Sequence, residues 1–406
     1  MTMTLNRFDD YFISLGFYTY IINEVIALLI LIINEPFYSL YFNYDFHVNI
    51  NLFVYFFCEI GFSTVTFWFF RTYFFSDGTP YKQHGPSPII FAMFWTLSIA
   101  INFYIDYSNG AVAGSVVVSN ITFIRELFPT TPWLYGAYYF YGSKSSKNNW
   151  VLSIPLILYC LTNLLLGWSG FILAIFTLEL VRINYRNGSS LKKTIVEYYL
   201  FLITFGAIGY AVIYPLKFFF RGYELSWISV PESLLFLLTR TSNFVSSYYL
   251  FCNSDKLITM LQTSVLNTIS PYSYVAESIA GFIPRFLWPD KPLFFNLNNV
   301  VEIYRVSFET TSNADLSILS KIVFLEKLEV LSGVLFVVYN ILILYFLKKL
   351  GKRYAPFSNM LIWSIYLQFL TASKVISFAE IVSIGVFFLE FELISILDKY
   401  LVRDIQ

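Results

Sequence analysis

Apolar runs that are long enough to cross a lipid bilayer recur along this chain, and they constrain its fold more than any other feature. Runs of 18 or more mostly apolar residues begin near residue 12 and follow one another to the C-terminal end. A helix needs about 20 such residues to cross a hydrocarbon core of about 30 Å. Only 13% of the residues are charged, about half the share in soluble proteins. The sequence therefore predicts an all-α polytopic membrane protein, a single integral membrane domain over residues 1–406.

About ten transmembrane helices are expected, and one long segment separates the last three from the rest. This segment, residues 217–317, contains many polar and aromatic side chains and too many leucines and aromatics for a disordered linker. We refer to it as the insert. The predicted spans are 12–33, 50–70, 89–107, 113–141, 150–167, 169–184, 195–216, 318–347, 357–373 and 375–397. The fourth is expected to be irregular, because Pro129 and Pro132 interrupt it.

Lysine and arginine residues gather in alternate short loops, and this asymmetry predicts the orientation in the membrane. The loops at 34–49, 108–112 and 167–170 contain none of them, and the loop at 371–375 contains only Lys374. We therefore predict that both termini are cytoplasmic and that the insert lies outside, in the periplasm of a Gram-negative cell. The basic set, predicted to be cytoplasmic, comprises Arg7, Arg71, Lys82, Lys144, Lys147, Arg182, Arg186, Lys192, Lys193, Lys348, Lys349, Lys352, Arg353, Lys399 and Arg403.

Charge and cysteine content argue against a nucleic-acid-binding protein and against a protein stabilised by disulfides. The formal net charge is zero, so no nucleic-acid partner is expected. The cysteines Cys58, Cys160 and Cys252 suggest no disulfide framework.

Three polar residues lie inside predicted spans, Asn23 and Glu24 in the first and Glu59 in the second. We expect them to pair between helices, although such groups can also line a conduit.

The pattern within the insert predicts two helices. Residues 233–249 fit one amphipathic helix. Its apolar face would lie on the membrane or the bundle, and its polar face would turn toward a cavity. A second short helix is expected over 272–283, ended by Pro284. The polar face of the first helix comprises Thr239, Arg240, Ser242, Asn243, Ser246 and Ser247.

A stiff, cationic stretch follows at residues 283–292, Ile-Pro-Arg-Phe-Leu-Trp-Pro-Asp-Lys-Pro. Its three prolines fix the backbone and forbid a continuous helix. Arg285 and Lys291 would then stand on a rigid frame beside Trp288. A guanidinium grips phosphate oxygens in a bidentate manner, whereas a lysine acts as a point charge. The alternative is an interfacial anchor that contacts lipid headgroups.

The stretch Pro-Arg-Phe-Leu-Trp-Pro-Asp-Lys-Pro resembles the segment found in the large outer loop of Wzy-type O-antigen polymerases, which join oligosaccharide repeat units. The general layout is also similar: ten or more spans, with a large outer loop in the C-terminal half and a tight outer hairpin before it. The related O-antigen ligases share much of this layout. Many relatives carry an arginine in the hairpin, but Gly167-Trp168-Ser169-Gly170 has none, so that arginine's role is missing here or is served by another residue.

The resemblance implies a fold, a reaction and partners. The fold would be a GT-C-like glycosyltransferase bundle in the bacterial inner membrane. A growing glycan on undecaprenyl pyrophosphate would be moved en bloc onto a lipid-linked repeat unit, with no cofactor. A separate co-polymerase would control chain length. The departing pyrophosphate requires cations, and the acceptor hydroxyl requires a base or a positioned acceptor.

The insert supplies the cations for such a reaction. Arg285 and Lys291 are the leading candidates, followed by Arg240 and then Arg221, which follows Lys217 by one helical turn. Lys217 and Arg221 also fit snorkelling at a helix end, and Arg240 fits a solvated face. Further contacts to substrate are expected from Trp288, Arg305, Glu277 and Asn243, although Arg305 also fits a solvated position.

The base must be a carboxylate if it lies in the insert, because no histidine follows His84. Asp290 lies inside the motif, where it can also pair with a neighbouring cation. Glu326 opens the eighth predicted span, where an ionisable group is costly, although Lys327 and Glu329 beside it allow a local ion pair. The other carboxylates are Glu224, Glu232, Glu277, Glu302, Glu309 and Asp315.

No Asp-X-Asp motif occurs in the chain, so we expect metal-independent transfer, with arginines in place of a divalent ion. Two rival functions remain. An O-antigen ligase generally uses an outer-loop histidine, which this chain lacks. A flippase or transporter of the same lipid-linked oligosaccharide commonly shows paired repeats and broken helices, and the sequence shows no repeat.

Overall fold

The computed structural model describes residues 7–36, 38, 46–75, 85–108, 122–142, 149–167, 170–220, 229–240, 242–264, 272–280, 316–355, 357–371 and 378–403, with isolated positions between 224 and 292. Helices account for 87% of this structure, and strands are absent from the same residues. An all-α protein is therefore confirmed.

The described helices occur along the chain in the following order. The first half contains α1 (Phe8–Ile33), α3 (Ile50–Phe74), α4 (Pro88–Ser108), η1 (Thr122–Leu127), α5 (Thr131–Gly136), η2 (Ala137–Tyr141), η3 (Asn149–Leu152), α6 (Ser153–Leu165), α7 (Gly170–Arg186), α8 (Leu191–Phe201), η4 (Leu202–Gly206) and α9 (Ala207–Phe220). The second half contains α10 (Val230–Arg240), α11 (Phe244–Ser264), α12 (Ser273–Ala280), α14 (Ile318–Leu328), α15 (Ser332–Gly351), η5 (Lys352–Tyr354), α16 (Phe357–Thr371) and α17 (Phe378–Arg403).

Five helical stretches are long and apolar enough to cross a membrane, in agreement with a multi-pass membrane protein. They are Phe8–Ile33, Ile50–Phe74, Pro88–Ser108, Leu191–Leu216 and Ser332–Tyr354. Two shorter apolar helices, Asn149–Leu165 and Phe357–Leu367, accompany them. The predicted count of ten spans is not established by these helices.

Two predicted spans are not single regular helices. The span 113–141, predicted to be irregular because Pro129 and Pro132 interrupt it, is divided in its described part into η1, α5 and η2. The predicted span 318–347 is wrong as a single helix, since α14 ends at Leu328 and α15 begins at Ser332. Leu331 between them has a left-handed backbone with φ of 66°, which no continuous α-helix contains.

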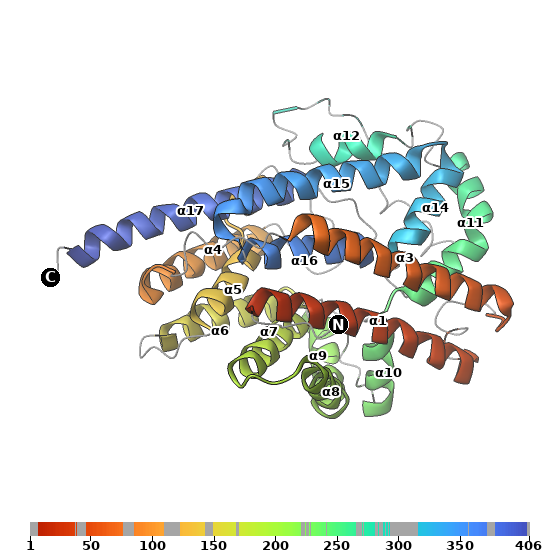
Figure 1. Cartoon of the computed structure of the whole chain (residues 1–406), viewed down its shortest axis with the longest axis horizontal. Helices are drawn as coiled ribbons and strands as arrows, with labels where there is room; N and C mark the ends of the chain where they lie inside the picture. The colour runs from red at the N-terminus through yellow and green to blue at the C-terminus, as the bar shows by residue number, and fades with distance from the viewer. Residues whose placement is uncertain are drawn as a thin grey trace.

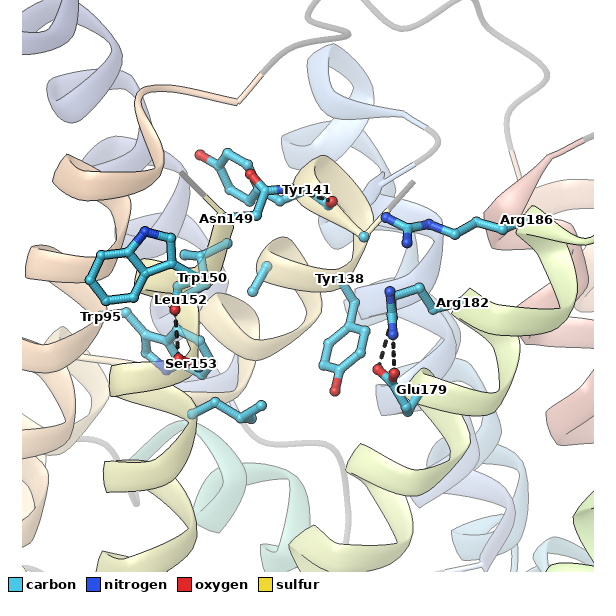
Figure 2. Close-up of a pocket in the computed structure, with 13 residues that line it drawn as sticks. Trp95, Tyr138, Tyr141, Asn149, Trp150, Leu152, Ser153, Glu179, Arg182 and Arg186 are labelled. Carbon is cyan, nitrogen blue, oxygen red and sulfur yellow. Dashed lines mark hydrogen bonds and ion pairs between the residues drawn. The ribbon is translucent and has the colours of Figure 1, made fainter. Parts of the chain in front are cut away.

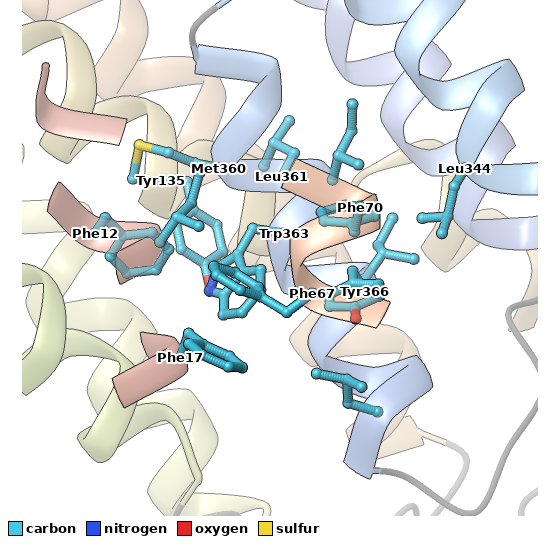
Figure 3. Close-up of a cluster of buried hydrophobic side chains, with 14 of the residues drawn as sticks. Phe12, Phe17, Phe67, Phe70, Tyr135, Leu344, Met360, Leu361, Trp363 and Tyr366 are labelled. Atoms are coloured by element: carbon cyan, nitrogen blue, oxygen red, sulfur yellow. The ribbon is translucent and has the colours of Figure 1, made fainter. Parts of the chain in front are cut away.

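Aromatic side chains hold the centre of the bundle together (Figure 3). Phe17 of α1 stacks on Phe67 of α3 at a centroid distance of 3.8 Å, and Phe67 meets Trp363 of α16 edge-on at 5.4 Å. Gly16 lets α1 approach α16, because a Cβ atom there would lie 2.9 Å from the Trp363 indole nitrogen. Each aromatic pair adds about 1 kcal/mol beyond the area that it buries, so α1, α3 and α16 form a firm core.

The helices of the insert pack into this bundle and do not only cover it. In Figure 1, α11, α12 and α14 gather at one end of the molecule, and the end of α17 extends from the other. Side chains from the beginning of α11 belong to the same buried core as α1 and α3, among them Phe244 (0% exposed) and Tyr249 (0% exposed). The short helix predicted over 272–283 is confirmed as α12, Ser273–Ala280.

The prediction of one amphipathic helix over 233–249 is wrong. The structure divides this stretch into α10, which ends at Arg240, and α11, which begins at Phe244. Residues expected on a polar face turned to a cavity are buried instead, including Asn243 (3% exposed) and Ser247 (0% exposed). The helix breaks here because a carboxylate of α1 binds the backbone N–H groups at the start of α11, as described next.

Candidate functional site

A cluster of polar side chains is buried in the bundle where α1 and α3 meet the beginnings of α11 and α14. It comprises Glu24, Glu59, Ser242, Asn243, Ser317 and Lys321, and we call it the polar centre. Glu24 and Glu59 are each 1% exposed, and Lys321 is 0% exposed. Burial of charged groups costs several kcal/mol for each ion, so the arrangement of their partners decides what the centre can do.

Glu24 binds the N-terminus of α11. Its carboxylate accepts hydrogen bonds from the Ser242 hydroxyl at 2.8 Å and from the backbone N–H groups of Asn243 and Phe244 at 3.2 and 2.9 Å. The first N–H groups of a helix have no partner within the helix, and the helix dipole favours an anion at this end. Glu24 therefore holds the N-terminus of α11 by accepting hydrogen bonds from a segment more than two hundred residues away.

Asn243 connects the beginnings of α11 and α14. The arrangement of its neighbours assigns the amide nitrogen to Glu24, 2.6 Å away, and the amide oxygen to the Ser317 N–H, 3.1 Å away. The same N–H donates to the Ser247 hydroxyl at 2.7 Å. Ser317 in turn caps α14 by accepting from the Ser320 N–H at 3.3 Å. Two helices thus begin inside the bundle on one hydrogen-bond network.

Glu59 differs from Glu24 in its hydrogen bonding. Neither of its carboxylate oxygens has a hydrogen-bond partner among the residues that the structure describes. The Tyr55 and Ser317 hydroxyls are near it without making a bond of ordinary geometry, and Glu24 and Lys321 interact with it electrostatically. The polar centre therefore contains two carboxylates and one lysine, and Glu59 is the member with oxygens available to take a proton.

The prediction that the buried polar residues pair between helices holds for Asn23, whose side chain accepts a hydrogen bond from Tyr199 of α8 at 2.8 Å. The partner of Glu24 was not foreseen. Ser242 and Asn243 are residue types that favour helix N-termini, and this was the signal in the sequence for a break at that position. Nothing local indicated that the capping carboxylate comes from α1.

Several predicted site residues lie outside the described part of the chain: Arg221, Arg285, Lys291 and Arg305. Three others are placed on helices as backbone positions. Lys217 lies near the end of α9, Arg240 is the last residue of α10, and Glu277 lies in α12. Of the motif itself, Trp288 is 37% exposed, and Asp290 is also exposed.

Glu326 has a defined structural role. Its two carboxylate oxygens accept from the N–H groups of Leu331 at 2.9 Å and Gly333 at 3.1 Å, so it caps the beginning of α15. The predicted local ion pair with Lys327 is replaced by another contact, since Lys327 binds Asp255 of α11 at 3.2 Å. Both oxygens of Glu326 are therefore already engaged.

The segment before the motif is attached to α15 and the turn that precedes it. The Tyr272 hydroxyl donates to the Val330 carbonyl oxygen at 2.5 Å, and the Ser278 hydroxyl donates to the Tyr339 hydroxyl at 2.5 Å. Since α12 ends at Ala280, the motif begins four residues beyond an anchored helix. Among the described residues, no group of three or more His, Cys, Asp or Glu side chains is positioned to hold a metal ion.

Comparison with known proteins gives no relative: no protein-family model matches the chain, and neither a curated protein nor a solved structure shows significant similarity to it.

Proposed function

We propose that this protein is a Wzy-type polymerase of lipid-linked oligosaccharide repeat units. The observation that carries the proposal is the sequence Pro-Arg-Phe-Leu-Trp-Pro-Asp-Lys-Pro at 284–292. The anchoring of α12 on α15 supports it, because α12 ends four residues before the motif in the sequence. The glycan would be transferred from undecaprenyl pyrophosphate to a second lipid-linked repeat unit.

The chemistry assigned to the motif is electrostatic. Arg285 and Lys291 bind the pyrophosphate more strongly as its negative charge develops, which lowers the barrier to its departure. Asp290 is the carboxylate of the motif that can accept the proton of the acceptor hydroxyl, and its exposure is compatible with that role. Glu326 is less suited to it, because the N–H groups of α15 occupy its oxygens. Trp288 offers a flat apolar face to a sugar ring.

The test is a glycan ladder from cells that carry Arg285→Ala, Arg285→Lys or the control Lys327→Ala. We expect Arg285→Ala to stop chain extension with normal protein level in the membrane. Arg285→Lys should recover little because the bidentate grip is lost. Lys327→Ala removes a cation from an exposed ion pair with Asp255 and should leave the ladder unchanged. A wild-type ladder from Arg285→Ala cells would exclude Arg285 from the reaction.

Metal independence is tested separately with purified protein and lipid-linked repeat units. Arginines are proposed to supply the charge that a divalent ion supplies elsewhere. Extension should therefore continue in EDTA. Activity that disappears in EDTA and returns with Mn²⁺ would contradict this part of the proposal.

A second function is favoured by one specific observation. Two helices, α11 and α14, begin inside the bundle on one network of buried polar groups, and interrupted helices of this kind are typical of transporters. The chain would then be a flippase of the lipid-linked oligosaccharide. A gene deletion separates the functions: loss of a polymerase leaves surface glycans one repeat long, whereas loss of a flippase leaves repeats facing the cytoplasm. Full-length chains retained on the carrier would indicate an O-antigen ligase.

A further inference from the structure

A hollow of about 360 Å³ lies between η2, the beginning of α6 and the end of α7 (Figure 2). This part of the bundle is distinct from the polar centre, which α1, α3, α11 and α14 form. The lining includes the side chains of Trp95, Trp150, Glu179, Arg182 and Arg186. Ligand sites commonly have this volume, with apolar walls and a few polar groups.

Among the residues that the structure describes, the lining of the hollow carries one positive charge beyond the paired ones. Arg182 binds Glu179 in a bidentate manner, with Nε donating to Oε2 at 2.8 Å and Nη2 donating to Oε1. Arg186 lies one helical turn further along α7, and within the described structure it forms no hydrogen bond or ion pair. Two arginines and one glutamate leave a single guanidinium free to bind an anion.

The walls of the hollow are apolar beside these charges. Trp95 is buried at 1% exposure and Trp150 is 66% exposed, and Leu156 extends the apolar wall along α6. This helix belongs to the shorter apolar stretch Asn149–Leu165. Tryptophan is enriched where membrane meets water, so the hollow combines an anion-binding group with a surface suited to a lipid.

We propose that this hollow binds a phosphate group carried by an anionic phospholipid, with Arg186 as the principal ligand. A guanidinium matches two phosphate oxygens at once, and a lipid's glycerol and upper acyl chain would cover the indole of Trp150. Inorganic phosphate shares the anion but lacks the apolar part. The negative charge of Glu179 opposes the bound anion and also holds Arg182 away from it.

The experiment measures phosphatidylglycerol retained by the purified full-length protein, using native mass spectrometry over a range of lipid concentrations. Arg186→Gln should weaken binding about tenfold, as expected when a hydrogen bond to a charged group is lost. Glu179→Gln should tighten binding, because it removes a repelling charge and releases Arg182. Lys192→Gln, which removes one exposed charge six residues from Arg186, is the matched control and should leave the affinity within about twofold.

Two further arms identify the source of the phosphate. Phosphatidylcholine, which is zwitterionic, should bind more weakly and with less dependence on Arg186. Competition by millimolar inorganic phosphate would show that the anion alone suffices, whereas its failure to compete would show that the lipid body is required. Equal affinities of the Arg186→Gln and Lys192→Gln proteins, or weaker binding in Glu179→Gln, would overturn the proposal. A misfolded variant cannot imitate changes in opposite directions.

Discussion

Glu24 and Glu59 show how two identical residues in neighbouring helices acquire different tasks. Glu24 accepts hydrogen bonds from the Ser242 hydroxyl, the Asn243 side chain and the backbone N–H groups of Asn243 and Phe244, whereas Glu59 accepts none from the described residues. A buried carboxylate is tolerated when donors compensate for the lost hydration. Lys321 interacts electrostatically with Glu59, but Glu59 lacks the hydrogen bonds that compensate Glu24.

The first prediction concerns Glu24→Gln. The amide would turn one N–H₂ group toward donors that require an acceptor, and those buried N–H groups would lose their partner. We expect a loss of about 3 kcal/mol, typical for breaking a buried charged interaction, seen as a lower melting temperature in detergent. Glu35→Gln, just beyond the end of α1, is the control. Unchanged melting of the Glu24→Gln protein would show that its carboxylate does not hold α11.

The second prediction is the contrasting result for Glu59→Gln. This change replaces a carboxylate whose burial is costly, and it removes no hydrogen bond that the structure describes. Stability should change by less than about 1 kcal/mol or increase, again measured by melting in detergent. Lys321→Met should lower the melting temperature. If Glu59→Gln is as damaging as Glu24→Gln, Glu59 has a partner that this account lacks.

Sequence analysis located these residues but not their roles. Glu24 and Glu59 were identifiable as costly groups inside apolar runs. The separation of 218 residues between Glu24 and Ser242 places their contact beyond any local pattern. Asn243 was expected to contact substrate from an exposed stripe, and it lies instead in the polar centre, at 3% exposure.

At the scale of elements, helix existence was predictable and helix interruption was not. The sequence pattern predicted one continuous helix over 233–249 and another over 318–347, because neither stretch contains a proline where the helix breaks. The interruptions coincide with carboxylate acceptors that cap the next helix. Glu24 of the distant α1 caps α11, and Glu326, near the end of the preceding α14, caps α15 through the N–H groups of Leu331 and Gly333. By contrast, Pro129 and Pro132 predicted the irregular stretch of η1, α5 and η2.

The third prediction uses the turn between α14 and α15. Leu331 has a φ of 66°, a conformation that costs a residue with a Cβ about 1–2 kcal/mol, and its side chain is 59% exposed. Leu331→Gly should therefore raise the melting temperature, since glycine adopts this backbone without penalty. Leu331→Ala keeps the Cβ atom and is the control. A lower melting temperature for the glycine variant would mean that the leucine side chain contributes more than its backbone costs.

For the whole molecule, the distribution of lysine and arginine predicted which loops share one side of the membrane. Three members of that set contact other segments of the chain: Arg71 lies 3.6 Å from Asp10, Arg353 lies 3.4 Å from Glu392, and Lys348 donates to the Tyr73 carbonyl. These contacts join segments that the loop charges assigned to the same side. Composition and periodicity therefore predicted the fold class and this grouping, whereas the packing of α10 and α11 into the core depended on distant contacts.

The fourth prediction tests which loops face the cytoplasm and which face the outside. In a chain whose three cysteines are replaced by serine, a membrane-impermeant maleimide should label Ser270→Cys from outside intact cells. Asn187→Cys should react only after the membrane is permeabilised, because it belongs to a basic loop predicted to be cytoplasmic. Both positions are exposed. The reverse pattern would invert the topology and place residues 284–292 in the cytosol, where undecaprenyl-linked glycans are not polymerised.

The dependence of α11 on Glu24 has a consequence for how the protein is made. Without Glu24, the first N–H groups of α11 would lose their carboxylate acceptor inside the bilayer. Placing unpaired backbone groups in hydrocarbon is costly, and the same applies to the polar side chains of Ser242 and Asn243. The beginning of α11 can therefore pack into the bundle only after α1 has been inserted and offers the Glu24 carboxylate. Because synthesis begins at the N-terminus, α1 is made before α11, and insertion should proceed in two stages. A defect in α1 should therefore lead to degradation late in folding, after the other spans have been inserted correctly.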